Sequence, residues 1–275
     1  MVNVDDFGAK GDGTDDSEVF KKAWKETCSS KEGVLVVPKN RIYRLKPITF
    51  SGPCKSALAL KIYGTIEASV DPSDYQKDRR HWLMFNNVQN FVVEGGGTIN
   101  GHGNIWWRNS CKIDKSRAVT FYGCKNFRVT NLRIINSQKM HLSFQKCINV
   151  KASNLIITAP EKSPNTDGIH ITETQNVQIM SSVIRTDQNY CDQETPCQEQ
   201  YSAVQVENVT YKNIEGTSAS QVALKFECSK NYPCEGIVLQ DINLNLQEDG
   251  NAKDSCVNVR LSSRGRVSPH CPGEE

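Results

Sequence analysis

The sequence lacks the long hydrophobic runs of a membrane protein and the charge excess of a nucleic-acid-binding protein. No window approaches the roughly eighteen consecutive apolar residues that a membrane-spanning helix needs. Lys and Arg number 33 against 31 for Asp and Glu, a surplus too small to indicate nucleic acid. A mixed, solvated surface explains these charges, although a local Lys and Arg cluster would suit a polyanionic sugar. No Pro/Gly/Ser-rich linker divides the chain, so we expect one domain over residues 1–275.

A secretory signal is also not visible in this sequence. Met1 runs directly into Val2-Asn3-Val4-Asp5, with no apolar stretch behind a basic start, so such a signal is either already removed or missing. Eleven cysteines are nevertheless present, and because the cytosol keeps thiols reduced they predict a secreted protein with disulfides. Zinc is the competing interpretation, but Cys228 and Cys234 are too far apart for a zinc knuckle. The glycosylation sequon at Asn208 agrees with secretion.

One helix is indicated near the start of the chain. Capping side chains are available at Thr14, Asp15 and Asp16. Apolar residues then fall on one helical face up to Cys28: Val19, Phe20, Ala23 and Trp24. The rest of the chain is predicted to form short strands rich in Val, Ile, Phe and Thr, separated by Gly, Asn, Ser and Pro.

Similar short segments recur along the chain, and each begins with an asparagine. They start at Asn90, Asn126, Asn149 and Asn176, at spacings of 36, 23 and 27 residues. Short strands that recur at about 20 to 30 residues without helices are typical of the coils of a parallel β-helix. A β-sandwich would also give short strands, but it gives no reason for a recurrence at coil length. The predicted helix would then cover the open end of the coil stack.

Two cysteines fit the same arrangement of coils. Cys124 and Cys147 are 23 residues apart, and each lies just ahead of its repeat asparagine. We therefore expect them to lie one above the other in successive coils, as buried thiols rather than as a disulfide. Segments 204–214 and 237–246 look like further coils.

The strongest functional signal is segment 165–171, Asn-Thr-Asp-Gly-Ile-His-Ile, which follows a proline-containing turn. Asn165 and Asp167 are two residues apart, so on a strand both side chains would point to the same face and could meet one ligand. The competing interpretation is a ladder of Asn and Asp turns in a solenoid, and these residues alone leave it open.

Several stretches resemble plant polygalacturonases, which are pectin-degrading β-helix enzymes. The resemblance covers nearly the whole chain in the family's order, which is more specific than any single motif. The similar stretches are 4–16 (VDDFGAKGDGTDD), 50–56 (FSGPCKS), 94–101 (EGGGTING), 163–168 (SPNTDG), 187–191 (DQNYC) and 211–217 (YKNIEGT).

The resemblance implies an all-β fold, a right-handed single-stranded parallel β-helix of the pectin-lyase-like kind with a short N-terminal capping helix. It also implies hydrolysis, with inversion, of the α-1,4-linked galacturonic acid backbone of pectin, without a metal or cofactor. Inversion uses two carboxyl groups about 6.5–9.5 Å apart, one to protonate the leaving oxygen and one to activate water. In the family's pattern Asp167 belongs to the catalytic carboxylates, Asn165 positions the sugar, and Tyr190 matches a tyrosine at the substrate cleft.

The same resemblance implies a secreted monomer of the cell wall. Its expected partners are polygalacturonate or pectin and cell-wall inhibitor proteins, with no nucleic-acid or membrane partner. Four disulfides are expected from proximity and from the resemblance: Cys28–Cys54, Cys191–Cys197, Cys228–Cys234 and Cys256–Cys271.

The chain departs from the family where most catalytic residues should be. In relatives, the equivalent of 181–186 runs on into a Gly-Asp-Asp-Cys motif with two more carboxylates. A Gly-His-Gly histidine and an Arg-Ile-Lys pair that binds the substrate carboxylate follow. Here Thr186 is followed at once by Asp187, so about three to four coils are missing. A smaller loss after 111–116 would leave Cys111 without a partner and explain the odd number of cysteines.

Three other residues are candidates near this site. His102, in a Gly-His-Gly sequence, precedes Asp167 and occupies the position of a structural loop. His141, in the coil before Asp167, is a candidate to line the cleft and bind substrate, and a surface histidine without a role is the competing interpretation. Asp187 is the obvious acidic residue at the junction, but the sequence does not show whether it approaches Asp167.

One carboxylate cannot act as acid and base on opposite sides of the same bond in one step. Each general acid–base group contributes about 10²–10⁴-fold, so we predict lost or severely reduced hydrolysis and a protein that acts, if at all, by binding pectin. Folding should survive, because each coil of a solenoid contacts only its neighbours. The alternatives are a polygalacturonase that uses other residues and a truncated product without a stable role.

Overall fold

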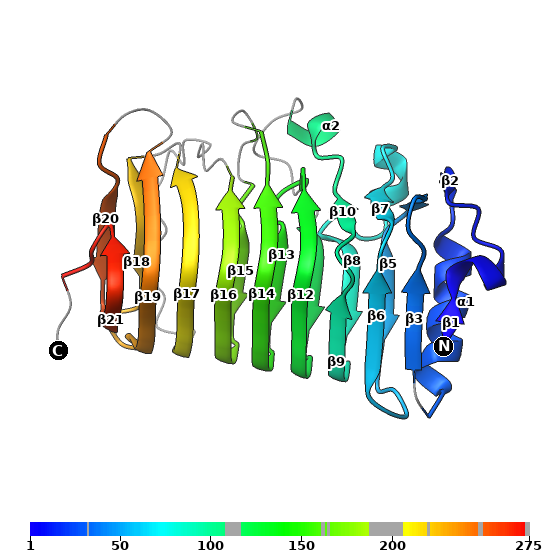
Figure 1. Ribbon diagram of the computed structural model, residues 1–275, viewed down its shortest axis with the longest axis horizontal. Coiled ribbons are helices and arrows are strands. Elements are labelled where there is room, and N and C mark those ends of the chain that lie inside the picture. Colours follow the sequence, from blue (N-terminus) through cyan, green and yellow to red (C-terminus); the bar gives the residue numbers. More distant parts are fainter. Residues whose placement is uncertain are drawn as a thin grey trace.

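Parallel strands stacked along one axis make up most of the structure. The computed structural model describes residues 1–31, 33–107, 117–160, 163, 166–186, 206–218, 221–246 and 250–272. Figure 1 shows the strands side by side along the long axis, with the helix α1 (Ser17–Ser29) at the N-terminal end. Within the described residues no helix is both long and apolar enough to cross a membrane.

The long sheet extends over the whole length of the stack. Its strands, in spatial order, are β1 (Val2–Asn3), β3 (Gly33–Val37), β6 (Leu58–Ile62), β9 (Gln89–Glu94), β12 (Lys125–Ile135), β14 (Ile148–Thr158), β16 (Gln175–Arg185), β17 (Glu207–Ser218), β19 (Cys234–Leu246) and β21 (Val259–Ser268). A branch joins it at β12 through β2 (Asp12–Asp15), β4 (Ile42–Leu45), β7 (Thr65–Ala68) and β10 (Thr98–Asn100).

Two further sheets complete the coils. The second sheet consists of β5 (Ile48–Ser51), β8 (His81–Asn86), β11 (Arg117–Tyr122), β13 (Leu142–Gln145) and β15 (Ile169–Thr172). The short sheet consists of β18 (Val222–Glu227) and β20 (Lys253–Val257). The helix α2 (Asn104–Trp107) and the 3-10 helices η1 (Val4–Phe7) and η2 (Pro72–Tyr75) are short. Strands pair in parallel from coil to coil, which confirms the predicted parallel β-helix and excludes an antiparallel sandwich.

The repeat asparagines turn the chain into the strands of the long sheet. Asn126, Asn149 and Asn176 have φ of 54°, 59° and 56°, in the left-handed region that asparagine tolerates better than most residues. Their amides form a ladder, in which Asn149 Nδ2 donates to Asn126 Oδ1 at 2.7 Å and Asn176 Nδ2 to Asn149 Oδ1 at 2.9 Å. The asparagines therefore recur in the sequence because each coil needs a residue that tolerates a positive φ at this turn.

Phenylalanine rings stack through the core from coil to coil. Phe121 on β11 is fully buried, and its ring centroid lies 4.9 Å from that of Phe85 and 4.7 Å from that of Phe127. The stack continues from Phe85 to Phe50 at 5.2 Å and from Phe121 to Phe144 at 5.7 Å. Because alternate strand residues face inward, the same core positions repeat in every coil.

The helix α1 covers the N-terminal end of the coils, as the sequence predicts. Phe20 and Trp24 are buried in the core. Asp16 occupies the N-cap position without a capping bond of its own, and Asp15 Oδ1 instead accepts a hydrogen bond from Ser17 N–H at 3.0 Å. A hydrogen bond of this kind satisfies a donor that the helix itself leaves unpaired.

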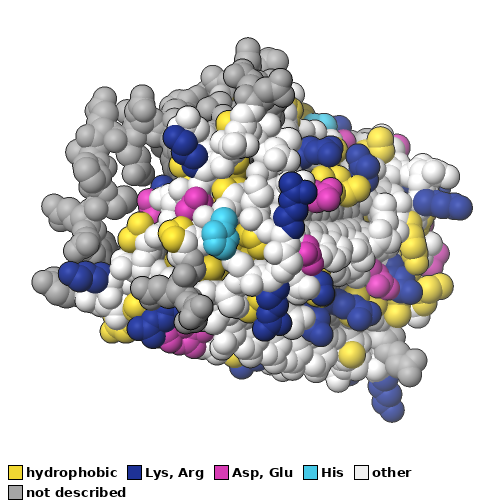
Figure 2. Space-filling view, turned by 60° about the vertical axis from the view of Figure 1, so that its left-hand side comes forward, with side chains coloured by type: hydrophobic (Ala, Val, Ile, Leu, Met, Phe, Trp, Pro, Cys, Tyr) yellow, Lys and Arg dark blue, Asp and Glu magenta, His cyan; other side chains and the backbone are white. Residues whose placement is uncertain are grey.

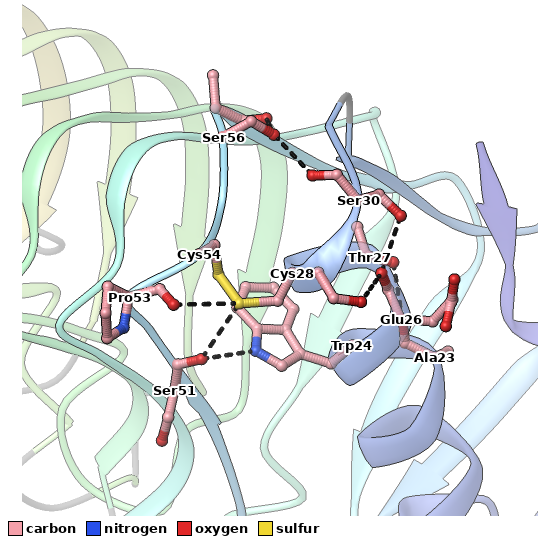
Figure 3. Close-up of a disulfide and its surroundings, with 12 residues drawn as sticks. Ala23, Trp24, Glu26, Thr27, Cys28, Ser30, Ser51, Pro53, Cys54 and Ser56 are labelled. Carbon is pink, nitrogen blue, oxygen red and sulfur yellow. Dashed lines mark hydrogen bonds between the residues drawn. A yellow bond between two sulfur atoms is a disulfide. The ribbon is translucent and has the colours of Figure 1, made fainter.

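A disulfide ties the C-terminal end of α1 to the coil beneath it (Figure 3). Cys28 is bonded to Cys54, and close by Trp24 Nε1–H donates to the Ser51 carbonyl at 3.1 Å. The helix is thus held both by its buried face and by a covalent link.

Loss of this disulfide should lower the free energy of unfolding by about 3.5 kcal/mol, because the link closes a 26-residue loop in the unfolded chain. Urea unfolding of Cys28→Ser/Cys54→Ser measures the loss. The matched control is Cys228→Ser/Cys234→Ser, which opens a loop of only 6 residues and should cost about 2 kcal/mol. Equal losses would contradict the loop-length argument.

The cysteine predictions are confirmed wherever the structure describes them. Two more expected disulfides are present: Cys228–Cys234 and Cys256–Cys271. Cys124 and Cys147 are buried free thiols in successive coils. The expected Cys191–Cys197 disulfide and the unpaired Cys111 lie outside the described residues.

Candidate functional site

The long sheet is continuous across the junction after Thr186, where the sequence indicates missing coils. β16 pairs with β17 in one register that runs from Gln175–Glu207 to Arg185–Thr217. The inward-facing valines of both strands are fully buried. On this side of the molecule the coils before and after the junction stack as ordinary neighbours.

The described part of the second sheet, by contrast, ends at β15, just before the junction. Among the described strands, β15 pairs with β13 only, and β18 pairs with β20 in the separate short sheet. A cavity of about 300 Å³ lies here, lined mainly by apolar side chains that include Ile169, Ile184, Leu224 and Phe226. The missing coils therefore leave the long sheet closed and the interior beside β15 incompletely filled.

Asp167 stands just before β15 and lines this cavity. Its main-chain carbonyl accepts a hydrogen bond from His141 N–H at 2.9 Å, which fixes it to the preceding coil. Burial raises the pKa of the Asp167 carboxyl, and the positive charges of His170 and Lys139 oppose this effect. A carboxyl with a raised pKa is suited to act as a general acid.

The charged neighbours of Asp167 within the described residues are bases. His170 and Lys139 are the charged groups that act on its pKa. Among the described residues that line the cavity, Asp167 is the only carboxylate. Asn165, Tyr190 and Asp187 lie outside the described residues, so their roles stay predictions. The described part of the site thus contains one carboxyl group, whereas hydrolysis with inversion uses two.

His141 is fully buried, with 0% of its surface exposed, so the interpretation as a surface histidine is wrong. Its Nδ1 lies 3.0 Å from the Asp167 carbonyl oxygen and its Nε2 lies 3.1 Å from the Thr158 carbonyl oxygen. With no exposed surface, the ring supports the backbone of Asp167 from inside the coil instead of facing a cleft. Burial lowers the pKa of His141 to about 4.

The free energy of unfolding should fall as the pH is lowered from about 6.5 to about 4. The His141 pKa is about 4 in the folded protein and about 6.5 in an unfolded chain. The unfolded chain therefore binds the proton first, and the stability present above pH 6.5 is lost across this window, by roughly 3 kcal/mol. Urea unfolding at several pH values should show a flatter profile for His141→Gln. Parallel profiles would exclude His141 as the cause.

Basic side chains extend from Asp167 along the second sheet, and we call them the basic cluster: Lys139 and His170 act on Asp167, Arg117 acts on His170, and Arg80 acts on Arg117. Burial lowers the pKa of His170, and the charges of Arg117 and Lys139 lower it further. Burial also lowers the pKa of Arg117, with a contribution from Arg80. Mutual repulsion of this kind favours binding of an anion, which relieves it.

A row of polar side chains crosses the second sheet beside the basic cluster. Thr120, Ser143 and His170 are in register on β11, β13 and β15. The Thr120 Oγ1 atom is buried and has no hydrogen-bond partner among the described residues. A buried hydroxyl without a hydrogen-bond partner lowers stability.

Sequence reasoning missed the basic cluster because its members come from different coils. The coil length was the signal available in the sequence. Leu142 pairs with Ile169, so Lys139, three residues before Leu142, lies beside Thr166 and close to Asp167. His102 was correctly assigned to a structural loop, since its Nε2 lies 2.8 Å from Glu67 Oε2 in a separate group of side chains.

The family model for glycosyl hydrolases family 28 matches residues 28–188 and 183–269. The two matched segments meet at the junction after Thr186, where the sequence indicates missing coils. Polygalacturonase-2 from Solanum lycopersicum is 41% identical over 373 aligned residues, which cover 100% of this chain and 81% of that protein. Polygalacturonase QRT2 from Arabidopsis thaliana is 43% identical over 369 residues, covering 98% and 84%. Because 373 aligned residues exceed the 275 of this chain, an internal segment is missing.

Solved structures of polygalacturonases share the fold. The exopolygalacturonase from Thermotoga maritima matches with a TM-score of 0.68 at 20% identity, covering 96% of this chain and 75% of that chain. The polygalacturonase from Erwinia carotovora matches with a TM-score of 0.67 at 18% identity, covering 91% and 75%. With the family model matched over most of its length and plant polygalacturonases more than 40% identical to it, this chain belongs to the glycosyl hydrolases of family 28.

Proposed function

We propose that this protein binds polygalacturonate beside Asp167 and has lost most or all of the hydrolytic activity of its complete relatives. The observation that carries the proposal is a described site in which one half-buried carboxylate, Asp167, has basic side chains and no second carboxylate as its charged neighbours. The basic cluster offers positive charge to the carboxylates of galacturonic acid. The relatives are polygalacturonases, which makes polygalacturonate the polyanion to test first.

The chemistry explains why binding can persist without hydrolysis. Asp167, with its raised pKa, is suited to protonate a leaving oxygen. Activation of a water molecule needs a second carboxylate about 6.5–9.5 Å away across the sugar. In the family's pattern the acids that would pair with Asp167 belong to the missing coils. Binding of polygalacturonate needs only the positively charged side chains of the basic cluster.

Two other functions have some support. Family membership favours a working polygalacturonase that uses a different second acid. The cavity beside β15 favours a truncated product without a stable role, because an unfilled apolar cavity lowers stability. The continuous register between β16 and β17 argues for a folded protein instead. A cooperative thermal unfolding transition distinguishes a folded protein from the truncated product.

We also infer that the protein is a secreted monomer of the cell wall, open to contact with cell-wall inhibitor proteins. The described disulfides support an oxidising compartment. Detection of the protein in cell-wall extracts tests the location, and gel filtration tests the monomeric state.

Replacement of Lys139 by Glu should weaken binding of short galacturonate oligomers about fivefold to tenfold, because it replaces an attractive charge beside Asp167 with a repulsive one. Titration calorimetry with a galacturonate trimer measures the affinity. Lys25→Glu, which changes an exposed residue of α1, is the matched control and should leave the affinity unchanged. Equal affinity of wild type and Lys139→Glu would refute binding at Asp167 and the basic cluster, which together we call the cleft.

A further inference from the structure

Four exposed cations project from β12 and β14 of the long sheet, whereas Asp167 lies just before β15 of the second sheet. Lys125, Arg128 and Arg133 project from β12, and Lys151 projects from β14. Arg128 and Lys151 are direct neighbours in the register of the two strands. Figure 2 shows Lys and Arg side chains spread over the visible face and interspersed with Asp and Glu. We call Lys125, Arg128, Arg133 and Lys151 the β12–β14 patch.

The charge of the β12–β14 patch is not neutralised by the described part of the protein. None of its four members forms a salt bridge with another described residue. Glu94 lies on the neighbouring β9, but its Oε1 atom is 3.9 Å from Nζ of Lys61, on the side away from β12. Glu207 shares a row with Lys125 but lies three coils away. The patch therefore presents unpaired positive charge to the solvent.

Two members of the patch, Arg128 and Lys151, line a groove of about 410 Å³. Its polar lining comes from the ladder residues Asn90, Asn126 and Asn149, and Arg128 and Lys151 follow two of these asparagines by two positions. Each amide nitrogen carries two hydrogens, and the ladder bond uses one of them. The exposed ladder therefore offers a line of further donors next to the cations.

We propose that this groove is a second binding site for an acidic polysaccharide, separate from the cleft at Asp167. Arg128 and Lys151, one coil or about 4.8 Å apart, would bind sugar carboxylates, and the ladder amides would bind sugar hydroxyls. The rings in the groove, Phe91 and Phe127, are only 1% and 3% exposed, so they offer no surface for stacking nucleic-acid bases. The site holds the protein on the polymer whether or not the cleft is occupied.

The choice of polygalacturonate as the probe rests on the proposed function, and the experiment keeps the two sites distinguishable. Retention on immobilised polygalacturonate is measured at increasing salt for wild type, Arg128→Glu/Lys151→Glu and the control Lys22→Glu/Lys25→Glu. Both double variants change exposed side chains and alter net charge equally. The patch variant should bind about tenfold more weakly than wild type. The control should stay within about twofold of wild type, and thermal unfolding of each variant verifies its fold.

Unchanged retention of the patch variant, or an equal loss in the control, would overturn the second site. Tighter retention of wild type on immobilised single-stranded RNA than on polygalacturonate would overturn the assignment to a polysaccharide. Loss in Arg128→Glu/Lys151→Glu with no loss in Lys139→Glu supports the groove and removes the cleft proposal. The opposite pattern removes the groove and keeps the cleft.

Discussion

Polygalacturonate incubated with this protein should release reducing sugars about ten-thousand-fold more slowly than it does with a complete plant polygalacturonase. One missing general acid–base group costs about 10²–10⁴-fold, and the residues that position the substrate carboxylate are missing as well. Among the described charged groups around Asp167 there is no second carboxylate, the group that activates water in an inverting hydrolase. A reducing-end assay with both proteins at equal concentration measures the difference.

The variant Asp167→Asn provides the control for this expectation. If Asp167 no longer supports catalysis, the variant should release reducing sugars at the same residual rate as wild type. Rapid turnover by wild type that Asp167→Asn abolishes would show a working hydrolase with a second acid. That result would replace the binding protein with the second candidate function.

Truncation of Phe121 to Ala should lower the free energy of unfolding by about 4 kcal/mol. The ring is fully buried and lies between the rings of Phe85, Phe127 and Phe144, so its removal loses the transfer free energy of the ring and leaves a cavity. Urea unfolding followed by intrinsic fluorescence measures this loss.

Ile156→Ala is the matched control for the core truncation. Ile156 lies on β14 with 37% of its surface exposed, so its truncation should cost no more than about 0.5 kcal/mol. A loss below about 1 kcal/mol for Phe121→Ala would mean that the ring stack does not hold the coils together.

The features of the fold that the sequence predicted are those set by local spacing. The positive φ at Asn126, Asn149 and Asn176 recurs once per coil, so the repeat can be recognised in the sequence from the recurring asparagines. The helix α1 has a regular apolar face, and Cys124 and Cys147 sit at equal positions of adjacent repeats. Each of these signals arises from a residue's own conformation or from its position in one coil.

The candidate site was only partly predictable, because it is built from side chains of several coils. The motif around Asp167 contained this acidic residue and His170, whereas the neighbouring charges of Lys139 and Arg117 became visible only once the strands were in register. The burial of His141 was missed because a polar residue in a turn is usually exposed. The two carbonyl groups that accommodate its ring belong to distant segments.

The way the chain accommodates the missing coils explains how folding and catalysis separate. In the long sheet, the strands on both sides of the junction share the same pattern of inward and outward residues, so β17 takes the place of the strand that would follow β16. The second sheet gains no such replacement among the described strands, and the cavity beside β15 results. Backbone pairing therefore survives on one side, whereas the constellation of carboxylates, which needs specific side chains on particular coils, does not.

A crystal structure with a galacturonate oligomer bound beside Asp167 tests the central claim most directly. We expect the sugar carboxylates to contact the basic cluster, and no second protein carboxyl to lie about 6.5–9.5 Å from the Asp167 carboxyl across the glycosidic bond. Asp187 or any other acid at that distance, with a water molecule held against the anomeric carbon, would contradict the loss of hydrolysis.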